Sequence, residues 1–143
     1  MITNQTVFKG HTQGLCSDLL DLTLDPKAAR KIGFPLSKEL VERELRIAQG
    51  TIIGAEIAFE TKVAFNIAGG THHAYSNRGE AFCLLNDQAI AAQYLLDTKL
   101  AKKVLIIDLD VHQGNGTAEI FQKNDKVFTF STHGKSNYPF KKE

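Results

Sequence analysis

The sequence is poor in several residue types whose patterns usually identify a class of protein. It contains no tryptophan, three prolines and two cysteines among 143 residues. Cys16 and Cys83 lie too far apart to form a C-x-x-C pair, so the sequence predicts neither a disulfide framework nor a cysteine-based metal site. This cysteine usage leads us to expect a reducing, cytoplasmic environment.

An excess of one charge and a long apolar run are also missing. The chain has 17 Lys and Arg residues against 16 Asp and Glu residues, a net charge of +1, so no overall charge directs it to nucleic acid. No apolar run approaches the ~20 residues that span a bilayer. The N-terminus also lacks the basic and then apolar pattern of a signal peptide. We therefore expect no direct nucleic-acid or membrane partner, and the sequence leaves the oligomeric state open.

Helical and strand patterns alternate along the chain. An apolar stripe predicts a long helix from about residue 38 to 59, capped by Ser37, and a second helix is predicted over 80–97. Short β-branched and aromatic runs predict strands at 62–68, 104–107 and 126–133. This alternation predicts a βαβαβ arrangement, hence an α/β fold with a parallel sheet whose strands are covered on both faces.

Ionisable residues follow each predicted strand. Asp108, Asp110 and His112 alternate after the apolar run 104–107, so extended backbone would project all three from one face. His72 and His73 follow the first strand in a glycine-rich loop. Ser131 and His133 close the third strand. Because parallel strands end at one sheet edge, we expect these groups to share a site, and carboxylate with imidazole suits zinc, iron or manganese.

Simpler interpretations remain open at this point. A single Asp at a strand end is usually a helix cap or a hydrogen-bond acceptor in a loop, and an adjacent His pair is usually solvated surface. Three ionisable groups in alternation favour a metal or catalytic site because unpaired burial of each would be costly. His11 has no acid or cysteine spaced with it, so we expect it on the surface or in a supporting layer.

Three motifs together resemble the zinc-dependent histone deacetylase family, whose fold is shared with arginase. They are Gly-Gly-Thr-His-His-Ala at 69–74, Phe-Cys at 82–83 followed by Asn-Asp at 86–87, and Ile-Asp-Leu-Asp-Val-His-Gln-Gly-Asn-Gly at 107–116. The form of the last motif is similar to the class IV branch and its bacterial relatives. The resemblance implies a three-layer α/β/α fold with a parallel sheet, and residues 1–143 as one partial deacetylase domain, incomplete at both ends.

The resemblance also implies roles for individual residues. Asp110 and His112 would be zinc ligands, while His72 and His73 would flank the zinc-bound water, one as the proton-transferring group. Asp108 would hold His72 and, with the Ser131 region, contribute to a monovalent-cation site such as one for K⁺. Phe82 and Tyr138 would form walls of the tunnel for the acylated lysine.

Two positions depart from the family pattern. Asn115 stands where many relatives have an Asp that pairs with the second histidine, so the pKa of His73 should be lower than with Asp. The class IV branch shares this Asn, so we do not expect it to inactivate the site. Ala81 stands where a glycine is usual before Phe-Cys, which puts the backbone of the pocket lining in question.

The expected function is hydrolysis of an acylated lysine or a related acylated amine by zinc-activated water. The family's third zinc ligand, an Asp, and its oxyanion-stabilising Tyr have no counterpart in this sequence, so we expect the chain alone to be an incomplete fragment. The alternatives are a non-catalytic or inactive deacetylase-like module and, less favoured, a binuclear manganese ureohydrolase. The latter would need a carboxylate where Gly114 stands.

Overall fold

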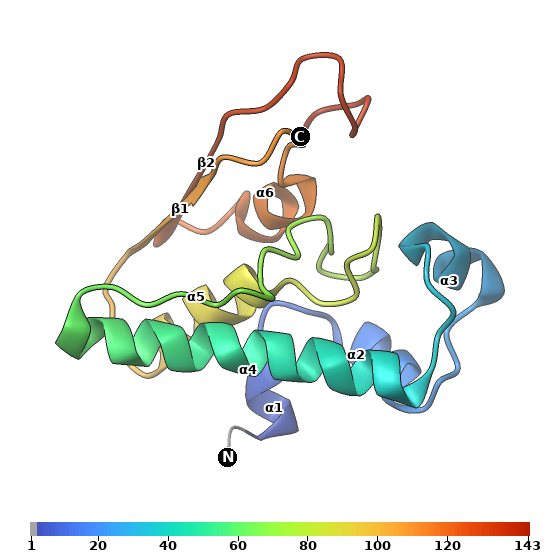
Figure 1. Ribbon diagram of the computed structural model, residues 1–143, viewed down its shortest axis with the longest axis horizontal. Coiled ribbons are helices and arrows are strands. Elements are labelled where there is room, and N and C mark those ends of the chain that lie inside the picture. Colours follow the sequence, from blue (N-terminus) through green and yellow to red (C-terminus); the bar gives the residue numbers. More distant parts are fainter. Residues whose placement is uncertain (1–2) are drawn as a thin grey trace.

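The computed structural model describes residues 3–143 as a set of helices packed against one face of a small parallel sheet (Figure 1). Three short helices come first and are followed by the long helix α4; α5 and α6 then flank strand β1, and β2 comes last (Figure 1). The bounds are α1 Asn4–Val7, α2 Gln13–Leu20, α3 Pro26–Ile32, α4 Lys38–Thr61, α5 Asp87–Asp97, β1 Val104–Asp108, α6 Asn115–Phe121 and β2 Val127–Ser131.

Helix α4 forms where the apolar stripe predicted it. The hydroxyl of Ser37 accepts a hydrogen bond from the Leu40 backbone N–H at 3.2 Å, which satisfies one of the free donors of the first turn. Val41, Ala48 and Ile52 of the stripe are buried. The stripe is not buried throughout, because Phe59 remains 46% exposed.

The largest core cluster joins α4 and α5 with buried residues of α1, α2 and α3. It contains Ile52 of α4, Ile90 of α5, and Leu84 and Leu85 from the segment before α5. A second cluster lies between α5, α6 and the sheet, where Ile106, Phe121 and Val127 pack together. Because α5 contributes to both clusters, it ties the strand ends to the helical half of the molecule.

Strands β1 and β2 pair in parallel, with Val104 opposite Val127 and Asp108 opposite Ser131. Helix α6 forms the crossover between them, as the βαβ pattern predicted. The prediction that both faces of the sheet are covered is wrong for the described residues. Ile106 faces the core, whereas the other face exposes large side chains, namely Leu105 (58%), Ile107 (56%), Phe128 (68%) and Phe130 (48%).

Two further element predictions require correction. Residues 62–68 form no strand: Val63, Phe65 and Ile67 are exposed, and β propensity alone does not form a strand without a partner. The second long helix begins at Asp87 rather than near residue 80, because Asn86 caps it by accepting from the Ala89 N–H at 3.0 Å. Residues 69–86 are therefore an irregular segment. No helix within residues 3–143 is long and apolar enough to cross a membrane.

Candidate functional site

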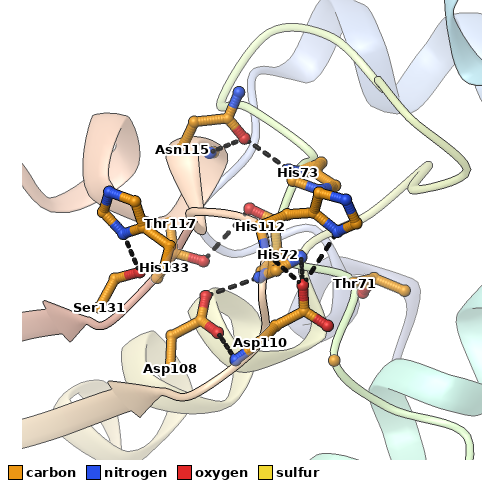
Figure 2. A network of polar contacts seen from close by, with 12 residues as sticks. Thr71, His72, His73, Asp108, Asp110, His112, Asn115, Thr117, Ser131 and His133 are labelled. Atoms are coloured by element: carbon orange, nitrogen blue, oxygen red, sulfur yellow. Dashed lines mark hydrogen bonds and ion pairs between the residues drawn. The ribbon is translucent and has the colours of Figure 1, made fainter. Parts of the chain in front are cut away.

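The site is built where β1 ends. Asp108, the last residue of β1, is buried, and its carboxylate accepts hydrogen bonds from the Asp110 backbone N–H at 3.0 Å and from His72 Nδ1 at 2.6 Å (Figure 2). Burial acts to raise the pKa of Asp108, but these hydrogen bonds hold the pKa below its usual range. Asp108 therefore presents a negative charge to His72 and fixes the proton of that imidazole on Nδ1.

The expected alternation of Asp108, Asp110 and His112 along one strand face is not what brings them together. Strand β1 ends at Asp108, and the chain turns so that Asp110 accepts from the His112 backbone N–H at 2.7 Å. Asp110 Oδ1 lies 3.1 Å from His112 Nδ1 and 4.0 Å from His72 Nε2. The three residues converge because of this turn, in which an Asp side chain bonds a backbone N–H two residues ahead.

His73 lies beside His72, with 4.1 Å between the ring centroids, and it bonds to a different partner (Figure 2). Its Nδ1 lies 2.7 Å from the amide oxygen of Asn115, the first residue of α6. The Asn115 amide nitrogen donates to the Tyr75 hydroxyl at 2.8 Å, which fixes the orientation of the amide. Burial lowers the pKa of His73, while the bond to Asn115 acts in the opposite direction. The sequence prediction compares Asn115 with an Asp at the same position, so it remains a prediction that only the substitution can test.

Close packing holds the histidine loop against the start of α6. The Thr117 backbone N–H donates to the His72 carbonyl at 3.2 Å. Gly116 lies directly against the backbone of Ala74 and His73, where a Cβ would overlap with the chain. The glycines after His112 therefore allow α6 to approach the loop closely and bring Asn115 to His73.

A cavity of about 480 Å³ opens over the two histidines. Asp110, His112, Phe82 and Tyr138 line it, together with His72, His73, Gly70, Ala81 and Cys83. The Tyr138 ring stands edge-on to His73 with 5.0 Å between centroids, and its hydroxyl donates to Glu80. Phe82 is 60% exposed and has a φ of 67°, next to Ala81 at 47°. The two predicted wall residues thus lie at the same cavity as the predicted metal ligands.

Cys83 shares the lining but is unsuited to nucleophilic chemistry. Burial raises the pKa of its thiol to about 12, so the unreactive protonated form dominates near neutral pH. The remaining candidates for chemistry in the cavity are His72, His73, His112 and Asp110.

Ser131 lies on the other side of Asp108. The two residues are paired in the sheet register, and both line a smaller cavity of about 160 Å³ with Phe130, His133 and Gly114. The Ser131 hydroxyl lies 2.9 Å from His133 Nδ1 (Figure 2). Asp108 thus lines the smaller cavity and bonds His72, which lines the larger one. Its role in a monovalent-cation site stays a prediction.

The donor atoms of Asp110 and His112 suit a common zinc ion. Two tetrahedral ligand atoms at 2.0–2.1 Å from one zinc are about 3.3 Å apart, close to the observed 3.1 Å. Within residues 3–143, no group of three His, Cys, Asp or Glu side chains is arranged to hold a metal. The described residues thus provide a pair of donors, to which a complete catalytic site would add a third.

Several residues around the site were not assigned a role from sequence. Tyr75 orients the Asn115 amide, Glu80 accepts from Tyr138, and Asp87 binds the loop before His72. His11 is a supporting residue: its Nδ1 lies 3.0 Å from the Tyr75 carbonyl, and its Nε2 accepts the Asn86 N–H at 2.9 Å. Only Asp87 had a sequence signal, since it belongs to the Asn-Asp pair at 86–87.

The family model for the histone deacetylase domain matches residues 2–143. The chain belongs to the histone deacetylase family. An uncharacterized protein of Picosynechococcus sp. is 52% identical over 121 residues, which are 85% of this chain and 40% of that protein. These matches confirm the family to which the three sequence motifs pointed.

Solved structures of the deacetylase family share the fold. A histone deacetylase (HDAC) homologue from Aquifex aeolicus matches with a TM-score of 0.81 at 32% identity, over 96% of this chain and 40% of that one. An HDAC homologue complexed with SAHA matches with a TM-score of 0.80 at 34% identity, over 98% and 40%. The predicted α/β fold of the arginase/deacetylase type is confirmed, and the chain spans 40% of the length of these relatives.

Proposed function

We propose that this deacetylase-family chain forms the metal-binding and proton-transfer part of a zinc-dependent amide hydrolase that removes acyl groups from lysine or a related acylated amine. The observation that carries the proposal is the convergence of Asp110, His112, His72 and His73 on one cavity. Membership of the histone deacetylase family supports the reaction class.

Asp110 and His112 would hold the zinc. When bound, zinc would polarise the amide carbonyl and lower the pKa of its bound water. The third donor and the oxyanion-stabilising hydroxyl would come from polypeptide other than residues 3–143. Asp110 and His112 are both partly exposed and lie at the cavity, so they are open to such a partner segment.

The two histidines are suited to different tasks. His72 Nδ1 bonds the carboxylate of Asp108 at 2.6 Å, which places a negative charge directly beside its ring. His73 bonds the neutral Asn115 amide and is held uncharged more readily because burial lowers its pKa. Since an amide oxygen only accepts hydrogen bonds, His73 keeps its proton on Nδ1 and presents Nε2 as a free base. We therefore propose His73 as the base that takes a proton from water, with His72 tuning the local charge.

The cavity walls indicate the substrate class. Phe82 and Tyr138 offer aromatic surface on the way to the donor pair, which suits the aliphatic stem of an acylated lysine. The match to a homologue complexed with SAHA supports the binding of an acylated chain. Acylated proteins and small acylated amines are both candidate substrates.

The geometry disfavours a binuclear manganese site. Such a site would need a carboxylate at Gly114, but a Cβ there would overlap with Asp108 and lie 3.3 Å from His72. Residue 114 therefore has no room for a side chain, and a single metal remains the better proposal.

Zinc affinity and acyl-lysine hydrolysis together test the proposal. Zinc binding would be measured by competition with a chelating dye for the wild-type chain, Asp110→Ala and His112→Ala. Asp125 is exposed, so Asp125→Ala is a control with the same charge change as Asp110→Ala. Each ligand variant should lower zinc affinity by more than about tenfold, and Asp125→Ala should leave it unchanged. Hydrolysis of an acetyl-lysine peptide that survives either ligand substitution would refute the assignment. Zinc binding without hydrolysis, even when a partner segment supplies the third donor, would favour the non-catalytic module.

A further inference from the structure

The Asn-Asp pair at 86–87 has no role in the proposed chemistry, yet both side chains are buried at the start of α5. Asn86 is 0% and Asp87 is 2% exposed. A buried carboxylate without partners is costly, so the contacts of Asp87 indicate what it does.

The Asp87 carboxylate binds the loop that leads into the histidine pair. It accepts from the Thr71 backbone N–H at 2.8 Å, from the Thr71 hydroxyl at 2.7 Å and from the Gly70 N–H at 3.0 Å. The Asp87 backbone N–H donates back to the Thr71 hydroxyl at 3.1 Å. Thr71 lies directly before His72 and is drawn beside it in Figure 2.

Helix α4 anchors the same carboxylate. The Thr51 hydroxyl donates to Asp87 Oδ2 at 2.6 Å, and Asn66 donates to Thr51 at 2.7 Å. Gly69 lies so close that a Cβ there would approach Asp87 Oδ2 to 2.6 Å. Asp87 thus links α4, α5 and the glycine turn in one network with little room for adjustment.

Asn86 holds the other end of the loop. Its amide nitrogen donates to the Ala74 carbonyl at 3.1 Å and to the Thr117 hydroxyl at 2.9 Å. His72 and His73 lie between the Asp87 contacts at Gly70 and Thr71 and the Asn86 contact at Ala74. The cap and the first residue of α5 therefore fix both ends of a short segment whose middle carries His72 and His73.

We infer that Asp87 is a positioning residue that sets the His72 ring against Asp108 and the His73 ring against Asn115. The inference rests on the proposed function for its importance to catalysis, but the geometry that it predicts can be measured without zinc or substrate. Removing the carboxylate releases Gly70 and Thr71, and the adjoining imidazoles then lose their fixed Nδ1 hydrogen bonds.

The test is NMR of the histidine side chains in the ¹⁵N-labelled full chain. In the wild-type chain, His72 and His73 should both show the Nδ1–H tautomer with slowly exchanging ring protons. In Asp87→Ala, both ring protons should exchange faster by about tenfold or more, with averaged tautomers, while the amide spectrum of α2 stays unchanged. Asp87→Asn keeps one acceptor oxygen for Thr71 and should fall between the two.

Two further variants keep the inference falsifiable. Thr71→Val retains the shape of Thr71 and the Asp87 carboxylate but removes the hydroxyl that makes two hydrogen bonds with Asp87. If Asp87→Ala does not fold, Thr71→Val tests the positioning role in its place. Ser37→Ala removes the cap of α4, which lies away from the loop, and should leave the histidine signals unaltered. Wild-type histidine tautomers and exchange rates in folded Asp87→Ala or Thr71→Val would overturn the inference. The result is independent of any failure to bind zinc or to hydrolyse a substrate.

Discussion

The Nδ1 atom of His73 lies 2.7 Å from the amide oxygen of Asn115. A neutral amide thus occupies the place from which a carboxylate would stabilise a charged imidazole. Asn115→Asp should therefore raise the pKa of His73, by about one unit or more. The measurement is an NMR titration of the His73 ring in both proteins. Asn124→Asp adds the same charge at a distance and should leave the pKa of His73 in place; an unchanged value in Asn115→Asp would contradict the electrostatic account.

Partly buried His11 should make the stability of the protein depend on pH. Burial, which disfavours the charged ring, lowers the pKa of His11 to about 4, although hydrogen bonds to the backbone of Tyr75 and Ser76 act in the opposite direction. The unfolded chain binds this proton near pH 6.5, so the contribution is complete above that pH and is lost as the pH falls to about 4. The loss is up to about 3 kcal/mol.

Urea unfolding of the wild-type chain and His11→Gln between about pH 7 and pH 4 checks this contribution. The variant should be less stable at neutral pH, and its free energy of unfolding should vary less with pH. Parallel pH profiles for the two proteins would show that His11 is not the group responsible.

The neighbours Ile52 and Ile53 on α4 provide a matched test of the core. Ile52 is 0% exposed and belongs to the main cluster, whereas Ile53 is 41% exposed. Ile52→Ala should lower the free energy of unfolding by about 2–5 kcal/mol because it leaves a cavity. Ile53→Ala changes the same atoms in the same helix and should cost less than about 1 kcal/mol. Similar losses from both substitutions, measured by chemical denaturation, would be inconsistent with the described packing.

Gly33 and Gly14 should respond in opposite ways to alanine. Gly33 ends α3 with a φ of 88°, and a Cβ there would come within 2.8 Å of the Phe82 ring. Gly33→Ala should therefore destabilise the chain by about 1 kcal/mol or more and displace Phe82 at the cavity. Gly14 lies in α2 with open space around its Cα, so Gly14→Ala should stabilise by about 0.5–1 kcal/mol. Thermal unfolding of both variants gives the signs directly.

Helix α4 and the β1–α6–β2 unit could be predicted from the sequence because each depends on local periodicity. The ionisable side chains that follow the strands could be predicted because they belong to strand-end motifs. It did not predict the burial of Glu44, which is 2% exposed beside Arg43. It also placed a strand at 62–68, since Val63, Phe65 and Ile67 alternate as a strand would. Alternating apolar residues show that a segment could form a strand. A strand forms only where a neighbouring strand is available to pair with it, and the sequence pattern does not reveal that neighbour.

The residues of the candidate site could likewise be predicted only in part. Asp108, Asp110 and His112 could be found from spacing, although a turn rather than a strand face brings them together. Asp87, Tyr75 and Glu80 could not be assigned, because their roles arise from contacts with residues distant in the sequence. Each of them acts through a hydrogen bond to a loop or ring. The Asn-Asp motif marks Asp87 but does not reveal its partner, and Tyr75 and Glu80 belong to no such motif.

The uncovered face of the sheet should also affect how this protein behaves in solution. Leu105, Ile107, Phe128 and Phe130 form an apolar surface beside unpaired strand edges within the described residues. Such a surface favours self-association by strand pairing and apolar contact. Because apolar attraction weakens on cooling, the purified chain should stay dispersed longer in the cold and associate reversibly as it warms.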